Sequence, residues 1–456
     1  MIARRMTPRR LATTAVVLAT VGAGTAFTIS ANAGTARDPG AAVTTDTPSV
    51  SPEMRAALRR DLSLTDAQLD ARLRREAWAA QTASALRQSL GDGYAGAWLT
   101  GGGQQLTVAV TDRALTNQVR AAGARAAVVA RSASELTTVK RALDRRAGAA
   151  STAVTGWYVD VATNTVVVRA APARMSAARS FVRSTGVDTD AVRLVASDTT
   201  PRLLYRPKPT PSYSPPSHET PPPYETAPPE ETEPPEETEP PEETAAPDGQ
   251  LVRGGDPYII EAQARCSVGF SVEGGFVSAG HCGDEGDATA TEVGQELVAQ
   301  GQFQASSFPG NDFSFVATGD GITPVGEVNS FGGENAGAAD RGEPLPVAGS
   351  QEAVVGTSVC KFGSTTGASC GEIQALGVTV RFADPEDGIG TVAVGGLIGT
   401  NVCAEPGDSG GSLLAGDQAQ GVVSGGSGDC DQGGETFFQP VNEILETLGL
   451  TLITSS

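Results

Sequence analysis

The chain has 456 residues and a formal net charge of −20 at pH 7, and it is long enough for two or three domains with separate cores. The part up to Pro201 is basic, whereas the part from Leu251 onward carries 27 Asp and Glu against 5 Lys and Arg. Such an acidic part repels phosphate groups, which argues against nucleic acid as its partner. The opposite charges of the two parts indicate that they attract each other.

The first 33 residues have the pattern of an export signal. Four arginines between positions 4 and 10 precede an apolar run over residues 11–29, and Ala31-Asn32-Ala33 supplies small residues for cleavage. A membrane anchor is the alternative, but Gly and Thr residues interrupt the run. We therefore expect a secreted, extracellular product with no membrane association after signal removal. Residues 34–50 are expected to be disordered.

Residues 51–205 are predicted to form a small α/β unit. Thr65-Asp66-Ala67-Gln68 has the capping-box pattern that begins a helix. Two hairpins are expected over residues 97–110 and 156–168, each with an aromatic residue near its start and a β-branched second strand. Each is followed by a helical stretch rich in Ala and Arg, which indicates an internal duplication. The alternative is two ordinary, unrelated hairpins.

Residues 206–251 are predicted to be a linker. The segment PPEETE (228–233) recurs at 234–239, and again without its last residue at 240–244. A chain of this composition cannot bury apolar surface, favours polyproline II, and is stiffened by repulsion between its carboxylates. The linker is therefore interpreted as a spacer.

Residues 252–456 have the pattern of an all-β domain, in which short apolar runs alternate with Gly, Asp, Asn and Ser turns. Only residues 440–450 have helical spacing. All six cysteines lie after residue 265, which indicates a disulfide framework with fifteen possible pairings. A zinc site is the alternative, but there is no CxxC pair and only one histidine here. We expect no metal and no cofactor.

A histidine and a serine of this domain lie in motifs suited to nucleophilic catalysis. His281 ends an apolar strand in VSAGHC (277–282), and Ser409 lies in GDSGG (407–411). The glycines allow the N–H groups of Gly407 and Ser409 to point to one spot, where they would stabilise an oxyanion. A serine nucleophile needs both a base and such donors. An esterase or lipase is an alternative, but the serine lacks the strand–elbow–helix context of that class.

A carboxylate should orient the imidazole. Asp312 begins the apolar strand NDFSFV (311–316), between His281 and Ser409 in the sequence. Most other acids of the domain lie in polar or Gly-rich stretches and are expected to be solvated. Asp312 is the candidate, and Asp320 is the second choice.

Residues 252–456 resemble the streptogrisin and α-lytic protease group of bacterial chymotrypsin-like serine proteases. The matching motifs are, in order, VRGG (252–255), SAGHC (278–282), NDF (311–313), GSTTG (363–367), PGDSGG (406–411) and SGGSG (424–428). Residues 51–200 resemble the pro-regions of the same group more loosely. The resemblance implies two β-barrels with the active site in the cleft between them, and a pro-region that assists folding and inhibits the enzyme. It also implies the disulfides Cys266–Cys282, Cys360–Cys370 and Cys403–Cys430.

The resemblance also implies the role of each site residue. Ser409 attacks the peptide carbonyl, His281 transfers the proton, and Asp312 orients the imidazole. The N–H groups of Gly407 and Ser409 form the oxyanion hole, and substrate backbone adds to the strand edge of Ser424, Gly425 and Gly426.

One supporting pair departs from the family pattern. Asp408 is expected to pair with Lys361, which stands where the family usually has Arg. A lysine makes a point contact rather than a fork, which would loosen the oxyanion turn. The alternative is that Lys361 is a solvated surface charge.

The function expected from these features is that of a serine endopeptidase made as a zymogen, monomeric when mature, with protein or peptide substrates. The alternative is a catalytically inactive relative that binds peptides or surfaces. Ala404 and residues 423–426 are small or uncharged, which predicts Phe, Tyr or Leu before the scissile bond. Glu405 and Asp429 are poorly placed for tryptic specificity.

Two self-cleavage sites fit the expected preference. The first choice is cleavage after Leu251, which would make Val252 the first residue of the mature enzyme. The alternative is cleavage after Tyr205, because the tail of the pro-region is expected to lie in the cleft like a product.

Overall fold

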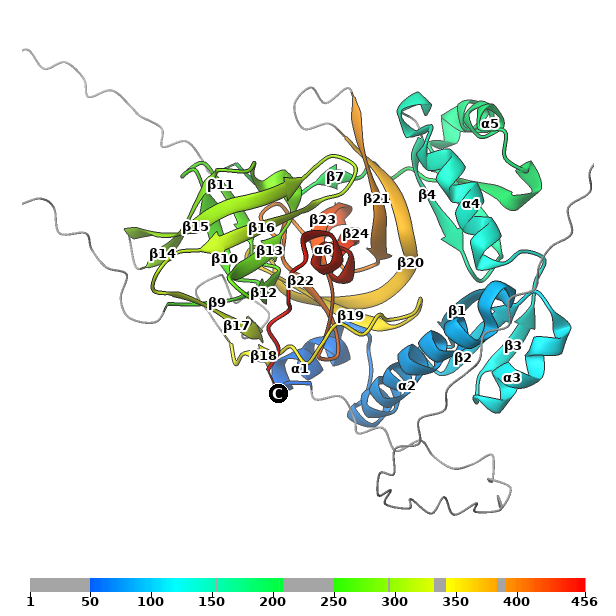
Figure 1. Cartoon of the computed structure of the whole chain (residues 1–456), viewed down its shortest axis with the longest axis horizontal. Coiled ribbons are helices and arrows are strands. Elements are labelled where there is room, and N and C mark those ends of the chain that lie inside the picture. Colours follow the sequence, from blue (N-terminus) through cyan, green and yellow to red (C-terminus); the bar gives the residue numbers. More distant parts are fainter. Residues whose placement is uncertain are drawn as a thin grey trace, which may run out of the picture. The chain divides into compact units, whose positions relative to one another are not determined.

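A computed structural model describes residues 50–152, 154–204, 206–207, 250–293, 296–331, 342–383 and 390–455 (Figure 1). The predicted export signal, nearly all of the predicted disordered stretch, Tyr205 and most of the linker lie outside the described residues. Among the described residues, no helix is long and apolar enough to cross a membrane.

The first half of the α/β unit (residues 51–205) begins with two helices, and a small sheet with a third helix follows. The predicted capping box is present, because the N–H of Thr65 donates to Gln68 Oε1 over 2.9 Å and the N–H of Gln68 donates to the Thr65 hydroxyl. Strand β3 pairs in parallel with the second strand of the β1–β2 hairpin. The elements are α1 (Pro52–Asp61), α2 (Asp66–Leu90), β1 (Tyr94–Thr100), β2 (Gln105–Val110), α3 (Thr116–Ala121) and β3 (Arg125–Val128).

The second half repeats this order. Its elements are α4 (Ala133–Asp144), β4 (Val154–Asp160), β5 (Thr165–Ala170), α5 (Met175–Ser184) and β6 (Val192–Ala196). Again the third strand, β6, runs parallel to the second strand of a hairpin, β5. Both predicted hairpins are confirmed, and the repeated order of helix, hairpin, helix and parallel strand agrees with an internal duplication. Each half buries its own apolar cluster.

The first part of the all-β domain is an eight-stranded sheet in the order β12-β13-β16-β15-β14-β10-β11-β8, in which β8 comes from the segment after the α/β unit. Its strands are β8 (Arg206–Pro207), β10 (Pro257–Ile260), β11 (Ala264–Ser267), β12 (Phe270–Val272), β13 (Gly275–Ser278), β14 (Ala288–Val293), β15 (Glu296–Ser307) and β16 (Phe313–Thr318). A separate small sheet contains β9 (Gln250–Gly254), β17 (Ile322–Val328) and β18 (Leu345–Pro346).

The second part closes into a ring of six strands, because β19 pairs with both β22 and β20. The strands are β19 (Ser358–Gly363), β20 (Gly367–Ala383), β21 (Thr391–Thr400), β22 (Ser412–Ala415), β23 (Gln418–Asp429) and β24 (Gly433–Pro440). Helix α6 (Val441–Leu448) follows, where helical spacing predicted it. The predicted fold class is confirmed: an all-β catalytic domain follows a smaller α/β unit.

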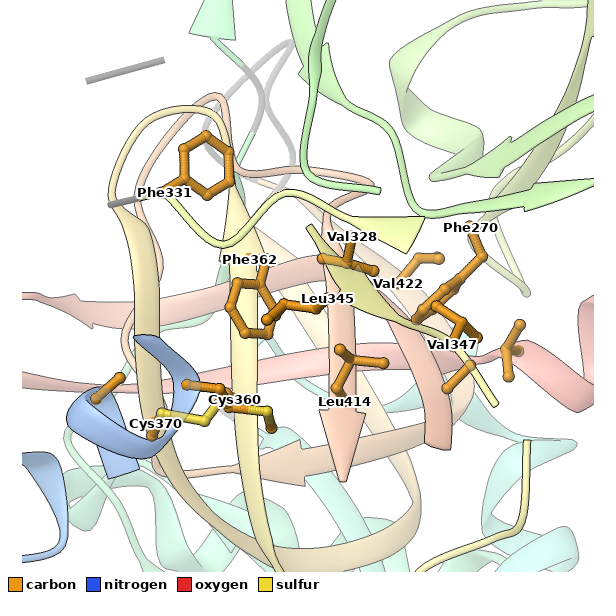
Figure 2. Packing of buried hydrophobic residues seen from close by; sticks show 14 of the residues in the cluster. Phe270, Val328, Phe331, Leu345, Val347, Cys360, Phe362, Cys370, Leu414 and Val422 are labelled. Atoms are coloured by element: carbon orange, nitrogen blue, oxygen red, sulfur yellow. A yellow bond between two sulfur atoms is a disulfide. The ribbon is translucent and has the colours of Figure 1, made fainter. Parts of the chain in front are cut away.

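One cluster of buried apolar side chains joins the two parts of the all-β domain (Figure 2). Phe270 and Val328 come from the first part, and Phe362 and Val422 come from the second. Burying one such side chain contributes about 1.5–3 kcal/mol. This shared core therefore fixes the two parts to each other, and with them the residues that each part contributes to the site described below.

Three disulfides join Cys266 to Cys282, Cys360 to Cys370 and Cys403 to Cys430. These are the pairings that the family resemblance implies. Each one ties together residues close in sequence, so each constrains a local loop, and bridges of this kind contribute about 2–4 kcal/mol.

The α/β unit extends the second part of the all-β domain by strand pairing. Strand β4 pairs antiparallel with β20, where Gly156 lies opposite Val380. A Cβ atom at Gly156 would lie 2.6 Å from the carbonyl oxygen of Thr379, so this close approach requires glycine. Strand β7 (Arg202–Leu203), near the end of the α/β unit, pairs with β20 and β23.

Candidate active site

His281 is positioned by the strand before it and by the disulfide after it. Strand β13 ends at Ser278, and a single 3₁₀ turn, Gly280–Cys282, carries the histidine. Because Cys282 is bonded to Cys266 on β11, the turn cannot swing away from the sheet. The backbone N–H of His281 donates to Asp312 Oδ1 over 2.9 Å, which fixes the turn to the start of β16.

The side chains of Asp312, His281 and Ser409 form a continuous hydrogen-bonded line. His281 Nδ1 lies 2.8 Å from Asp312 Oδ2, and His281 Nε2 lies 2.8 Å from Ser409 Oγ. Since a carboxylate only accepts, Nδ1 carries the proton, and Nε2 is left to accept the serine hydroxyl. The three predicted residues, which are up to 128 positions apart, are thus brought together.

Two residues hold Asp312 in this position, and sequence reasoning missed both roles. The hydroxyl of Ser424 donates to Asp312 Oδ2 over 2.5 Å, and the N–H of Asp312 donates to Gln439 Oε1 over 2.9 Å. Both partners are fully buried. Ser424 was expected only at the substrate strand, and its side chain points instead to the carboxylate. No local sequence signal marks Gln439.

The turn before Ser409 has a backbone conformation that requires glycine. Gly407 has a φ of +103°, and a Cβ atom there would collide with the hydroxyl of Thr365 and approach the guanidinium of Arg265. Gly410 also has a positive φ, and its N–H donates to the carbonyl of Val423. This bond fixes the turn to β23.

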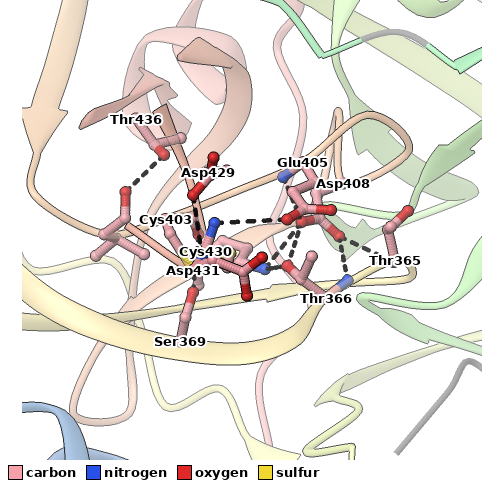
Figure 3. The surroundings of a disulfide bond; sticks show 12 residues. Thr365, Thr366, Ser369, Cys403, Glu405, Asp408, Asp429, Cys430, Asp431 and Thr436 are labelled. Atoms are coloured by element: carbon pink, nitrogen blue, oxygen red, sulfur yellow. Dashed lines mark hydrogen bonds and ion pairs between the residues drawn. A yellow bond between two sulfur atoms is a disulfide. The ribbon is translucent and has the colours of Figure 1, made fainter. Parts of the chain in front are cut away.

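Asp408 anchors the turn through its buried carboxylate (Figure 3). It accepts hydrogen bonds from the N–H groups of Thr365, Thr366 and Glu405 and from the Thr366 hydroxyl. Lys361 completes the set, with its Nζ 3.0 Å from Asp408 Oδ2. Burial opposes ionisation of Asp408, but Lys361 and these hydrogen bonds outweigh it and hold the pKa of Asp408 below its usual value.

Lys361 is fully buried rather than solvated. Its ammonium group donates to Asp408 Oδ2, to the carbonyl of Gly367 at 3.0 Å, and to the hydroxyl of Thr366. A lysine has three N–H donors, and all three are used here. The substitution of lysine for arginine therefore leaves no buried donor without a partner.

The end of the α/β unit lies in the site as an extended peptide. Leu203 and Arg202 pair antiparallel with Gly425 and Gly426 on β23. The carbonyl oxygen of Leu204 accepts a hydrogen bond of 2.8 Å from the N–H of Gly407. After Leu204 the chain continues to β8, which pairs antiparallel with β11. The residue whose carbonyl accepts from the predicted oxyanion donor Gly407 is therefore Leu204.

The side chain of Leu204 is almost completely buried, at 1% exposure, in an apolar cluster that includes Ala404 and Val423. The two acids considered for tryptic specificity are engaged elsewhere. Glu405 accepts a hydrogen bond from the N–H of Cys430, and Asp429 accepts from backbone N–H groups of its own loop. The surroundings of Leu204 are thus apolar.

Comparisons with known proteins match both the N-terminal and the C-terminal part of the chain to known families. Family models described as "Alpha-lytic protease pro N-terminal", "Alpha-lytic protease prodomain" and "Trypsin" match residues 67–129, 131–189 and 252–448. Streptogrisin-C from Streptomyces griseus is 43% identical over 412 residues, which covers 89% of this chain and 76% of that protein. Streptogrisin-D from the same organism is 34% identical and covers 81% of this chain and 79% of that protein.

A solved structure, a chymotrypsin from Cellulomonas bogoriensis, is 51% identical over 45% of this chain and 100% of that chain, with a TM-score of 0.39. The trypsin-type domain and the streptogrisin relatives make the C-terminal part a chymotrypsin-like serine endopeptidase. The chain belongs to the streptogrisin and α-lytic protease family, and it carries the family's pro-region. Among the described residues, no group of His, Cys, Asp or Glu could hold a metal ion.

Proposed function

We propose that this chain is the secreted zymogen of an endopeptidase that uses Ser409, His281 and Asp312 and cleaves after large apolar residues. The observation that carries the proposal is the hydrogen-bonded line of these three side chains beside a backbone N–H, that of Gly407, which already holds a peptide carbonyl. A base, an activated hydroxyl and an oxyanion donor around one carbonyl are the parts that acyl transfer requires.

Each residue has one task in the proposed mechanism. The Ser409 hydroxyl attacks the peptide carbonyl carbon while His281 Nε2 takes its proton. Asp312 holds the imidazole in the tautomer that makes this possible, and stabilises the imidazolium. The N–H groups of Gly407 and Ser409 stabilise the oxyanion, and His281 then returns the proton to the leaving amine. Water hydrolyses the acyl-enzyme by the same steps in reverse order.

The proposed preference for Leu, Phe or Tyr before the scissile bond follows from the surroundings of Leu204. This side chain is buried among apolar residues that include Ala404 and Val423. A charged side chain in its place would lose its hydration with no partner of opposite charge, which costs several kcal/mol. Substrate backbone would add to β23 at Gly425 and Gly426, the positions that now pair with the pro-region tail.

The pro-region supports a zymogen because it occupies the positions that a substrate needs. Its tail takes the β23 edge and the Gly407 N–H, so no other peptide can bind there at the same time. The opposite net charges of the pro-region and the protease domain favour their association. The mature enzyme is proposed to be a monomer without a cofactor.

A fluorophosphonate probe tests the proposed nucleophile. The processed enzyme should be labelled covalently, Ser409→Ala should abolish labelling, and Ser427→Ala, which removes a partly exposed serine on the same domain, should leave labelling unchanged. A peptide library should then show cleavage after Leu, Phe or Tyr at least tenfold faster than after Lys or Glu. Labelling that persists in the Ser409→Ala variant, or a preference for charged residues, would contradict the proposal.

A further inference from the structure

The chain offers two bonds for self-cleavage at opposite ends of the linker, and the structure distinguishes them. One follows Leu204, at the end of the pro-region, and the other follows Leu251, at the start of the protease domain. The two cuts would give different mature enzymes, because only the first leaves the acidic linker attached to the protease.

The bond after Leu204 is presented to the site on both sides. On the amino side, Leu203 and Arg202 are paired with β23. On the carboxyl side, Arg206 and Pro207 are paired with β11. Between these two pairings the carbonyl of Leu204 accepts the Gly407 hydrogen bond, and Ser409 lies two residues further along the same turn. This is the arrangement of a substrate that spans the cleft.

The bond after Leu251 is held inside a strand. Leu251 and Val252 belong to β9, where they pair in parallel with Thr323 and Pro324 of β17. The carbonyl of Val252 accepts a further hydrogen bond from the hydroxyl of Ser271, and the Val252 side chain is 2% exposed. To reach Ser409, β9 would have to leave its sheet and expose this buried valine.

We infer that the zymogen cuts itself after Leu204, and that the mature protease begins at Tyr205 and keeps the Pro/Glu/Thr-rich segment as an N-terminal extension. This inference rests on the proposed function. Ser409 Oγ bonds to the Leu204 carbonyl carbon, and the C–N bond to the next residue breaks as His281 protonates the new amine. Water then releases the Leu204 carboxylate. Cleavage is intramolecular and follows first-order kinetics, independent of protein concentration.

The retained extension changes the charge of the mature enzyme. Residues 205–249 contain 11 Asp and Glu but only two basic residues, so the extension adds about nine negative charges to an already acidic domain. The mature product is therefore larger and more acidic than a protease that begins at Val252.

The test is to follow the purified full-length chain through its first cleavage by N-terminal sequencing and intact mass. The first protease fragment should begin at Tyr205. Leu204→Asp should slow this cleavage on the order of 100-fold, since the buried pocket gives a carboxylate no partner. Leu251→Asp is the matched control, and it should cleave at the normal rate and still yield Tyr205. A first fragment that begins at Val252, or first cleavage slowed by Leu251→Asp and not by Leu204→Asp, would overturn the inference.

Phosphonate labelling separates this inference from the proposed function. If the proposed function fails, neither the wild-type chain nor the Leu251→Asp control is labelled at Ser409. If only the processing inference fails, the processed enzyme is labelled and hydrolyses peptides normally, but it begins at Val252. The rate should also be unchanged across a tenfold range of protein concentration. A rate that rises in proportion to concentration would contradict cleavage within one chain.

Discussion

Replacement of Lys361 by methionine tests how much the buried ion pair supports the oxyanion turn. Methionine keeps most of the side-chain volume but removes the only cation that contacts the buried Asp408 carboxylate within the described residues. Removing one partner of a buried ion pair typically costs about 3–5 kcal/mol. Asp408 keeps its other hydrogen bonds, from Thr365, Thr366 and Glu405, so we expect the lower figure, about 3 kcal/mol.

For a domain of this size, about 3 kcal/mol corresponds to a fall in Tm of about 6–12 °C. The measurement is thermal unfolding of the full-length chain with Ser409→Ala as background, which prevents self-digestion. Asp408→Asn added to Lys361→Met is the control: it removes the unpaired charge, so part of the lost stability should return. In the active background, kcat/KM should fall by less than the 10²–10³ that loss of a whole oxyanion donor costs.

The effect of Lys361→Met should depend on pH with a defined sign. The pKa of Asp408 lies below its usual value in the folded protein, so its ionised form stabilises the fold above the ordinary carboxylate range, and this contribution is lost as pH falls through the lowered pKa. In the variant the carboxylate protonates more readily. The difference in Tm should therefore be largest near pH 7 and should narrow below about pH 4. Equal Tm values at pH 7, with equal activity, would refute the reasoning.

Three substitutions test other parts of the site by steady-state kinetics of the processed enzyme. Gly407→Ala should lower kcat/KM about 10²–10³-fold, because the added methyl collides with a neighbouring side chain; Gly274→Ala, at a positive φ with open space around it, is its control and should retain activity. Ser424→Ala removes a hydrogen bond to the Asp312 carboxylate and should lower kcat about 10–100-fold with little change in KM. Gly425→Ala should raise KM for extended peptides at least tenfold, since its Cβ would enter the space of the paired strand; an unchanged KM would contradict strand addition there.

The parts of the site that could be predicted from the sequence are those in which neighbouring residues carry the chemistry. His281 and Ser409 lie in short motifs with glycines that the local backbone needs, and Asp312 begins an apolar strand. The support of Asp312 by Gln439 could not be predicted, because it joins residues 127 positions apart through one buried hydrogen bond. A glutamine at the end of a strand gives no local signal of such a partner.

The register in which the pro-region tail pairs with β23 could not be predicted from the sequence either. The apolar run Leu203-Leu204-Tyr205 offers three residues that fit an apolar pocket, and composition alone does not choose among them. Cleavage after Tyr205 was the alternative expected from the sequence. The choice of Leu204 depends on pairing with Gly425 and Gly426 and on one hydrogen bond to Gly407, and these exist only in the folded chain.

Helix α1 is a further anchor of the pro-region, at a distance in sequence from the tail. It lies before residues 67–129, the first segment matched by a pro-region family model. Its buried residues Met54, Ala57 and Leu58 belong to the apolar cluster that includes the Cys360–Cys370 disulfide, and Figure 2 shows a turn of α1 (blue) beside Cys370. Asp61 Oδ2 accepts a hydrogen bond of 2.8 Å from the N–H of Cys370.

This contact predicts that Leu58→Asp weakens the complex between the cut pro-region and the protease without affecting catalysis. Truncating a buried leucine costs about 2–5 kcal/mol, and the buried carboxylate adds to this cost, so the affinity should fall at least about 30-fold. The assay dilutes self-processed protein and finds the concentration at which half of the protease is active. Ala56→Asp, which places the same charge on the exposed face of α1, should leave that concentration unchanged. If Leu58→Asp also leaves it unchanged, α1 does not contribute to inhibition, and the pro-region is held by its other contacts with the protease, such as the tail, the β4–β20 pairing and the Arg72–Glu372 ion pair.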